Sequence, residues 1–552
     1  MKMPLAVAVT AILLLTPYLA HGQAKIKIIN IDGPGVGLND PAPVQAVGGN
    51  PGRTLSQQRS IVFQYAADLW GALLVSGPEV RIDASLSPLT CTPSETVLGQ
   101  AGPKAMVTGD KIFEDGAPDY YYFVSMANSI SGKDFTPEVS HVGMEFNSSI
   151  DNPDCQRFGA NGWFYGLHGN QVDNPGYRSN FLNVIMHEMG HGLGFAHANI
   201  AWRMFDSPYG EKAWSKDLAM FLNEIPADPA AVRTALTGPG RAVWRGDKAS
   251  STAALLAEQK KLFKIVSPEP ALYEYVGATF GPQDRKAIKG EIVLVQDEVQ
   301  QDGRVLNTGC DGSDGAPKIA NRGALKGKVA LVDMGGCGRE VKILNAQNLG
   351  AVGLIIANNV PLDSLRLGNG GKVRSQISIP AISVTQEVGA LLRSTEPVVA
   401  EGFVEDKTQR YGLDSNGDIM LYTPKAYSPG STMSHIVIEM APDFLMEAAE
   451  GRDMRADVMI DVTLDMLEEM GWSTNRNGTA KIGNCETGIP VYKDGFIPGA
   501  NLMAHSSMCK TVHAASRAQQ LRCMNDQINW LHDQTLLSSA EVVKARQCVA
   551  KL

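Results

Sequence analysis

Residues 187–197 read HEMGHGLGFAH, and this stretch decides how the rest of the chain is interpreted. It ends a predicted helix over residues 179–193, whose apolar side chains repeat at helical spacing along one face: Leu182, Ile185, Met186, Met189 and Leu193. His187 and His191 are four residues apart, so their side chains lie on the same side of that helix. The spacing therefore places two imidazoles where they can bind one metal ion.

The neighbouring residues complete the pattern of a hydrolytic zinc site. Glu188 can reach a zinc-bound water and take its proton, because zinc lowers the pKa of such a water to about 7. Gly194 allows a sharp turn that brings His197 back as a third ligand and leaves one position open for water. A buried helix with hydrogen-bonded histidines is the alternative, although chance gives the 11-residue pattern in only about one such chain in fifty thousand.

Residues 187–197 resemble the zinc motif of the metzincin metalloendopeptidases. The resemblance implies one catalytic Zn²⁺ bound by His187, His191 and His197, with Glu188 as the general base. It also implies a methionine turn beneath the zinc. Met446 is chosen for it over Met420 and Met433, since it precedes a helix that ends at 470–472.

The same resemblance implies an edge strand that pairs with an extended peptide substrate. It is expected over residues 141–146, which contain His141, Gly143 and Glu145 as substrate-binding residues. A tyrosine that assists the zinc is not expected, because no tyrosine stands at the second position after Met446. The oxyanion stabiliser is therefore left unassigned.

Residues 285–402 differ in texture from the rest of the chain, with apolar β-rich runs around one predicted helix at 340–348. The segment KVALVD at 328–333, followed by Gly336-Cys337, Asn345-Ala346, Gly350-Ala351 and Asn358-Asn359, resembles a protease-associated domain. Such domains accompany several secreted peptidases. Here the domain would be inserted between the third zinc ligand and the methionine turn.

We therefore predict an α+β fold: a metzincin-like catalytic domain with an inserted α/β protease-associated domain and a disulfide-linked helical C-terminal tail. The expected parts are a signal peptide at 1–22, catalytic segments at 23–284 and 403–474, the insertion at 285–402, and a cysteine-rich tail at 475–552. Helices are expected at 504–530 and 539–549 of the tail.

Composition and the N-terminus indicate a secreted protein. Apolar residues make up 44% of the 552 and the net charge is −9, which argues against disorder, and no basic patch suggests a nucleic-acid partner. The segment MKMPLAVAVTAILLLTPYLAHG has the layout of a signal peptide. We expect an extracellular or periplasmic monomer without a membrane span in the mature chain.

Eight cysteines behind a signal peptide predict disulfides. Local spacing favours Cys91 with Cys155 and Cys310 with Cys337. The last four allow three connectivities. A helical hairpin would favour Cys523 with Cys548 and leave Cys485 with Cys509.

Other patterns in the sequence give weaker indications of function than the zinc motif does. Asp414, Asn416 and Asp418 have the opening spacing of a calcium loop, but Ile419 and Lys425 break it, so a structural Ca²⁺ is possible but unsupported. A serine peptidase is rejected because the stretch at 430–433 has its serine and threonine in the wrong order. His435 and Glu439 follow this region, and we expect hydrogen-bonded structural roles for both.

The predicted function is a secreted zinc endopeptidase that hydrolyses peptide bonds of proteins or peptides by Glu188-assisted attack of a zinc-bound water. The alternative is a catalytically silent secreted protein that binds a partner through the inserted domain and the tail. Its zinc would be structural or absent, and a fourth protein ligand such as Cys91 would close the site.

Overall fold

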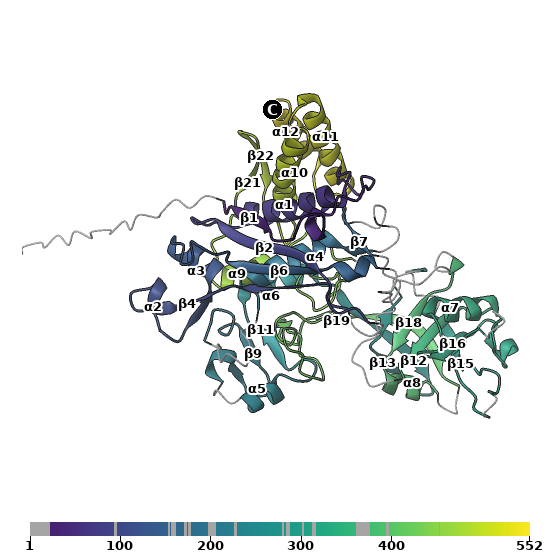
Figure 1. The fold of residues 1–552 in the computed structure, drawn as a ribbon. Helices are drawn as coiled ribbons and strands as arrows, with labels where there is room; N and C mark the ends of the chain where they lie inside the picture. The colour runs from purple at the N-terminus through teal and green to yellow at the C-terminus, as the bar shows by residue number, and fades with distance from the viewer. Residues whose placement is uncertain are drawn as a thin grey trace, which may run out of the picture.

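A computed structural model gives the fold of residues 23–552, apart from gaps at 93–95, 153–154, 156–161, 170–173, 175–177, 197–205, 226–228, 279–280, 283–287, 301–302, 312–315, 360–375, 394–396 and 452. Helices and strands mix throughout a central part, a lateral lobe and a C-terminal helical part (Figure 1). The expected signal peptide at 1–22 lies outside the described residues.

The central sheet has the order β1-β2-β6-β3. Strands β1 (Ile26–Asn30), β2 (Val80–Ser87) and β6 (Val142–Asn147) are parallel, and β3 (Gly99–Pro103) is antiparallel to β6. Strand β6 is thus paired on both sides, so the expectation that 141–146 forms the edge strand is wrong. The edge is β3.

Helices α1 (Leu55–Leu73) and α4 (Phe181–Leu193) pack against this sheet and against each other. The hydroxyl of Thr54 accepts the amide of Gln57 at 3.2 Å and caps α1. The core is aromatic where α4 begins. The Phe181 ring centroid lies 4.9–5.4 Å from those of four neighbours: Phe63, Phe146, Trp163 and Tyr165.

Shorter elements complete the central part. They are β4 (Met106–Thr108), α2 (Gly109–Ile112), β5 (Tyr121–Phe123), α3 (Val124–Ser131), β7 (Trp163–Phe164), β8 (Ser179–Asn180), β9 (Ala213–Ser215), β10 (Met220–Phe221), α5 (Pro229–Ala235), β11 (Ala242–Trp244), α6 (Asp247–Leu256), β20 (Ile419–Met420) and α9 (Thr463–Glu469). Strands β10, β9, β11 and β20 form a second sheet in that order. Because β20 follows the lateral lobe in sequence, this sheet joins the two halves of the central part.

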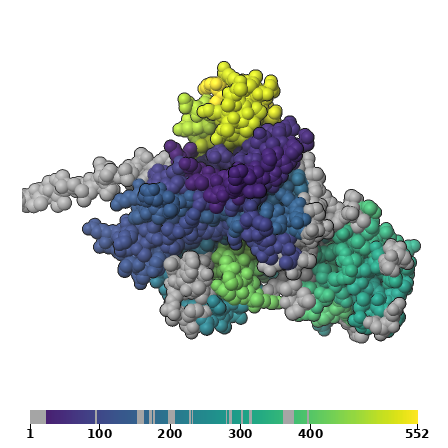
Figure 2. Space-filling view, viewed as in Figure 1, coloured from purple at the N-terminus to yellow at the C-terminus, as the bar shows by residue number. Residues whose placement is uncertain are grey.

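The lateral lobe contains an eight-stranded sheet of order β13-β12-β19-β15-β16-β17-β18-β14. Its elements are β12 (Gln259–Ser267), β13 (Ala271–Tyr273), β14 (Val276–Gly277), β15 (Lys289–Leu294), β16 (Val329–Asp333), α7 (Arg339–Asn348), β17 (Gly353–Ala357), β18 (Ala381–Val384), α8 (Gln386–Leu391) and β19 (Val399–Arg410). The chain enters through β12 and leaves through β19, and these two strands pair antiparallel. The lobe therefore stands to one side of the central part (Figure 2).

The C-terminal part consists of the hairpin β21 (Thr479–Ile482) and β22 (Cys485–Pro490) with α10 (Pro498–Val512), α11 (Arg517–Asp533) and α12 (Ser539–Val549). Helix α10 packs on α1, so the tail lies on the central part (Figure 1). The single helix predicted over 504–530 is instead two, because the chain turns between Val512 and Arg517.

Four disulfides link the chain. Cys91–Cys155 and Cys310–Cys337 are the predicted pairs. The tail pairs are Cys485–Cys548 and Cys509–Cys523, so the guess of Cys485–Cys509 and Cys523–Cys548 is wrong. The break after α10 explains the difference, since it turns α11 back along α10 and brings Cys523 to Cys509. Among the described residues, none of the helices has the length and apolar character needed to cross a membrane.

Candidate metal centre

Helix α4 carries the motif, and its packing fixes which side faces outward. The side chain of Asn180 caps the helix by accepting the amides of Leu182 and Asn183. On the core side, Trp70 donates its indole N–H to the carbonyl of Met186 at 3.3 Å. The helix ends at Gly194 with φ +135°, a conformation that favours glycine and matches the turn predicted there.

Two glycines of the motif allow close packing around α4. A Cβ on Gly192 would lie 2.3 Å from the Val142 side chain on β6. A Cβ on Gly190 would lie 2.7 Å from Sδ of Met446, which is fully buried. Met446 thus lies directly against the helix between the two histidines.

Three imidazoles meet at one side of α4. His187 and His191 lie beside His435, with ring centroids 4.6–5.1 Å apart. One nitrogen of each lies within 4.8 Å of the others. His435 comes from the chain that follows the lateral lobe, 244 residues beyond His191.

Each of these imidazoles is tied to a backbone carbonyl through Nδ1. The acceptors are Leu445 for His187 at 2.6 Å, Phe195 for His191 at 2.7 Å, and Ser431 for His435 at 3.0 Å. A carbonyl only accepts, so Nδ1 is the protonated nitrogen and Nε2 carries a lone pair. This is the arrangement by which proteins orient metal-binding histidines.

The Nε2 atoms of His191 and His435 lie 3.2 Å apart. With both Nδ1 atoms protonated, neither Nε2 has a proton to share, so the contact is between two lone pairs. Burial lowers the pKa of His187 to about 4 and that of His435 to about 3, and it holds that of His191 well below its usual value. The three side chains are therefore neutral at pH 7, and their donor set fits a divalent metal such as zinc.

Glu188 is the carboxylate next to this cluster. It is buried, and its Oε2 atom has no hydrogen-bond partner in the described part of the chain. Burial raises its pKa to about 8. A buried carboxyl without a partner is unfavourable unless a cation or a reacting group meets it, which fits a metal at the neighbouring imidazoles.

The cluster opens into a cleft of about 1500 Å³ between the central part and the lateral lobe. One stripe of α4 lines it, from Asn180 through Asn183 to His187, Glu188 and His191. The opposite wall includes residues of the lateral lobe: Lys260, Glu274, Tyr275, Arg339, Ser383 and Glu387. The histidine cluster is thus accessible from a cleft that both parts form.

Strand β3 forms the side of the cleft nearest to the carboxylate. A Cβ on Gly99 would lie 3.0 Å from Oε1 of Glu188, so the backbone of the edge strand passes close to it. The three residues expected to bind substrate lie one strand away on β6 or just before it. His141 is fully buried and contacts Asp134 at 3.1 Å, so it has a structural role in the core. Gly143 and Glu145 share the paired strand.

Three other residues considered in the sequence as ligands or as neighbours of the site have different outcomes. His197, the third expected ligand, lies outside the described residues. His435 was expected to have only a structural role, but the fold places it in the cluster. No helical spacing links it to the motif, and its presence among only ten histidines was the one available signal. Cys91 is in a disulfide and cannot serve as a thiolate ligand.

Comparisons with known proteins identify one part of the chain. Residues 288–392 match the family model of the PA domain, so the lateral lobe contains a PA domain. No curated protein matches the chain.

Two solved structures are similar over part of their length. A zinc aminopeptidase from Bacillus subtilis is 16% identical over 40% of this chain and 46% of its own, with a TM-score of 0.19. An aminopeptidase from Aneurinibacillus sp. strain AM-1 is 18% identical over 37% of this chain and 42% of its own, with a TM-score of 0.17. The chain therefore spans less than half of either protein, and scores of this size do not establish a shared fold.

Proposed function

We propose that this protein is a zinc-dependent peptidase of the metzincin type, with His187, His191 and His435 as ligands and Glu188 as the general base. The observation that carries the proposal is the orientation of the three imidazoles. Each has Nδ1 tied to a backbone carbonyl and Nε2 turned to a common point, beside a buried carboxylate oxygen without a partner.

Bound zinc would supply Lewis-acid chemistry, polarising the scissile carbonyl and lowering the pKa of water. Glu188 supplies the proton transfer. Its carboxylate takes a proton from the attacking water and later passes that proton to the leaving amine. Glu188 is buried beside the imidazoles, so the proton that it takes is shielded from bulk water until it is passed on.

The substrate would be an extended peptide segment. Strand β3 is the last strand of the described sheet and its backbone lies beside Glu188, so a peptide added along it would pass the proposed metal. The channel continues along α4 and past the PA lobe. This length favours cleavage within a chain, that is, an endopeptidase.

The position of Met446 supports its assignment as the methionine turn. Its backbone carbonyl accepts the amide of Ile436 at 2.9 Å, next to His435, and the carbonyl of Leu445 holds His187. One short segment therefore braces two proposed ligands from below. The four disulfides favour an oxidising compartment and hence secretion.

A second candidate function follows from the number of histidines. If His197 also binds the metal together with His435, four protein ligands close the site. The zinc would then be structural, and the protein would act as a secreted binding protein through its PA domain and tail.

The test measures zinc content and the cleavage of an unstructured protein substrate for the mature wild type and for His435→Ala, His197→Ala and Glu188→Gln. The proposal predicts that His435→Ala loses zinc and activity together, whereas Glu188→Gln keeps zinc and loses activity. The matched control is Glu274→Gln, a carboxylate of the cleft wall that is 71% exposed. A wild type that binds zinc without cleaving, and that loses the metal in both histidine variants, would favour the closed site.

A further inference from the structure

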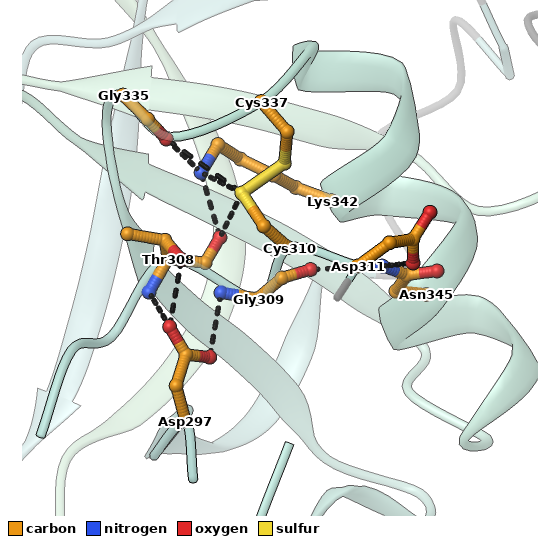
Figure 3. The surroundings of a disulfide bond; sticks show 9 residues. All are labelled: Asp297, Thr308, Gly309, Cys310, Asp311, Gly335, Cys337, Lys342 and Asn345. Carbon is orange, nitrogen blue, oxygen red and sulfur yellow. Dashed lines mark hydrogen bonds between the residues drawn. A yellow bond between two sulfur atoms is a disulfide. The ribbon is translucent and has the colours of Figure 1, made fainter. Parts of the chain in front are cut away.

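A buried lysine lies against a disulfide of the PA lobe. Lys342, on the first turn of α7, is 0% exposed. Its ammonium donates to the carbonyl of Gly335 at 2.5 Å and to that of Thr308 at 2.7 Å, and it lies 3.4 Å from Sγ of Cys310 (Figure 3). Two carbonyls and one sulfur therefore match the three N–H bonds of the ammonium.

The segment that carries Cys310 is fixed from several sides. Asp297 accepts the amide and the hydroxyl of Thr308 and the amide of Gly309, at 2.7–2.9 Å. Asn345 donates to the carbonyl of Gly309 at 2.9 Å and to Asp311 at 2.8 Å (Figure 3). These bonds do not involve the disulfide, so the sulfur of Cys310 stays beside the ammonium even when the disulfide is open.

The lysine keeps most of its charge at neutral pH. Burial lowers its pKa to about 8, and the nearby carboxylates of Asp297 and Asp333 oppose the shift. An ammonium in contact with a sulfur atom stabilises a thiolate far more than a neutral disulfide. The charge therefore favours the reduced form of Cys310.

The two sulfurs differ in their surroundings. Lys342 contacts the sulfur of Cys310, whereas Cys337 stands in a run of exposed glycines, Gly335, Gly336 and Gly338. Both cysteines are partly exposed, and glycines carry no side chain to block an incoming thiol. Attack on Cys337 is favoured because the sulfur that then leaves is the one beside the Lys342 ammonium.

We propose that the Cys310–Cys337 disulfide is a modification site for low-molecular-weight thiols. A thiolate attacks Sγ of Cys337 and forms a mixed disulfide there, and the electron pair of the broken bond leaves on Cys310 as a thiolate that pairs with the Lys342 ammonium. A second thiol then resolves the mixed disulfide, so that the external thiols are oxidised to their disulfide and both cysteines are reduced. The thiolate that leaves is the one that the Lys342 ammonium stabilises at 3.4 Å, and a stabilised leaving thiolate speeds exchange.

The site is connected to the cleft of the proposed peptidase, although the inference does not depend on that function. Arg339, two residues after Cys337 and first in α7, lines the cleft wall. Cys337, Lys342 and Asn345 all hold α7 and the residues just before it to the segment at 308–311. Opening the disulfide therefore removes one of these three attachments, the one nearest to Arg339.

The first experiment places the adduct. Oxidised wild-type protein is treated with limiting glutathione, free thiols are blocked, and peptide mass spectrometry measures which cysteine carries glutathione. The expected result is glutathione on Cys337 and the blocking reagent on Cys310. A majority of adduct on Cys310 would overturn the proposal, and this measurement requires no variant.

The second experiment measures the contribution of the charge. Lys342→Met keeps much of the side-chain length without the ammonium, and Lys326→Met removes an exposed lysine of the same lobe as a control. In buffers of oxidised and reduced dithiothreitol, we expect at least a tenfold lower equilibrium constant for reduction of Cys310–Cys337 in Lys342→Met. If this equilibrium constant changed by less than twofold while circular dichroism showed that the lobe is still folded, the proposed role of the Lys342 charge would be wrong. The disulfides Cys91–Cys155 and Cys485–Cys548 serve as internal references.

Discussion

Among the described residues, two groups of side chains bring three possible metal-binding atoms within 4.8 Å of one another. The first group is His187, His191 and His435. The second, in the tail, is His505 with the disulfide-bonded Cys509 and Cys523. By distance alone both qualify as metal sites, yet their chemistry differs.

The difference lies in what the potential ligand atoms are bonded to. The first group has three Nε2 lone pairs turned inward, because each Nδ1 is occupied by a backbone carbonyl. In the second group the two sulfurs are bonded to each other and offer no thiolate, and Nδ1 of His505 is buried without a partner in the described part of the chain. Closeness of side chains therefore does not define a metal site; the hydrogen bonds behind the ligands do.

The largest expected effect concerns the group beside the first cluster. Glu188→Gln removes the general base while keeping the shape of the side chain. We expect the rate of peptide hydrolysis to fall by about 10²–10⁴-fold, the usual contribution of general acid–base catalysis, with zinc retained. Steady-state cleavage of a fluorogenic peptide together with metal analysis checks this. Near wild-type turnover in this variant would make the assignment of Glu188 wrong.

The metal content of two histidine variants tests the comparison directly. His435→Ala should release zinc at chelator concentrations that leave the wild type loaded. Loss of a residue that only hydrogen-bonds to a metal ligand already weakens metal binding about 10–100-fold, and loss of a direct ligand should weaken it more. His505→Ala should leave zinc affinity unchanged. If both variants lost one equivalent of zinc, the tail would also be a metal site and the distinction drawn here would fail.

The packing beneath the first cluster gives a smaller effect. Gly190→Ala places a methyl group 2.7 Å from Sδ of Met446, so the helix or the methionine must move. Overpacking of this kind costs about 1–3 kcal/mol of stability, and the movement would also displace the histidines on either side. Chemical denaturation and zinc affinity measure the two consequences. Gly102→Ala is the matched control, because its Cβ would meet no atom within 4 Å.

Local patterns explain what could be predicted from sequence. The helical repeat and the four-residue histidine spacing concern neighbours along the chain, so α4, its C-terminal glycine turn and the orientation of its two histidines follow from residues 179–194. The parallel strands of the PA lobe are apolar on both faces, which also shows in the sequence.

Long-range relations could not be predicted. His435 reaches the site only because β12 and β19 pair and return the chain after the whole PA lobe. The edge strand β3 reads GQAGP, without the alternating apolar pattern of a half-buried strand, so the sequence does not predict it, and the family resemblance points to the neighbouring strand β6 instead. The tail connectivity depended on a turn between α10 and α11 that the uninterrupted helical pattern concealed.

The smallest expected effect concerns stability, and it distinguishes a buried neutral histidine from a ligand. Burial and, to a smaller extent, the nearby His168 lower the pKa of His505 to about 3. The folded protein then binds fewer protons than the unfolded chain between about pH 3 and pH 6.5. Stability should therefore fall as the pH drops through this window, because protons favour the unfolded state.

Replacing His505 with phenylalanine removes that dependence and fills the space beside Tyr65, whose ring lies 6.0 Å away. Between pH 7 and pH 5.5 we expect this group alone to lower the free energy of unfolding of the wild type by about 1 kcal/mol. The decrease over the same pH range should be smaller by about 1 kcal/mol in His505→Phe. Urea unfolding of the tail at the two pH values gives both numbers. His513→Phe serves as the control, because His513 is the residue that caps the C-terminus of the same helix, α10. An equal loss in wild type and His505→Phe would mean that His505 is charged in the folded protein, and its orphaned nitrogen would then need a partner from outside the described chain.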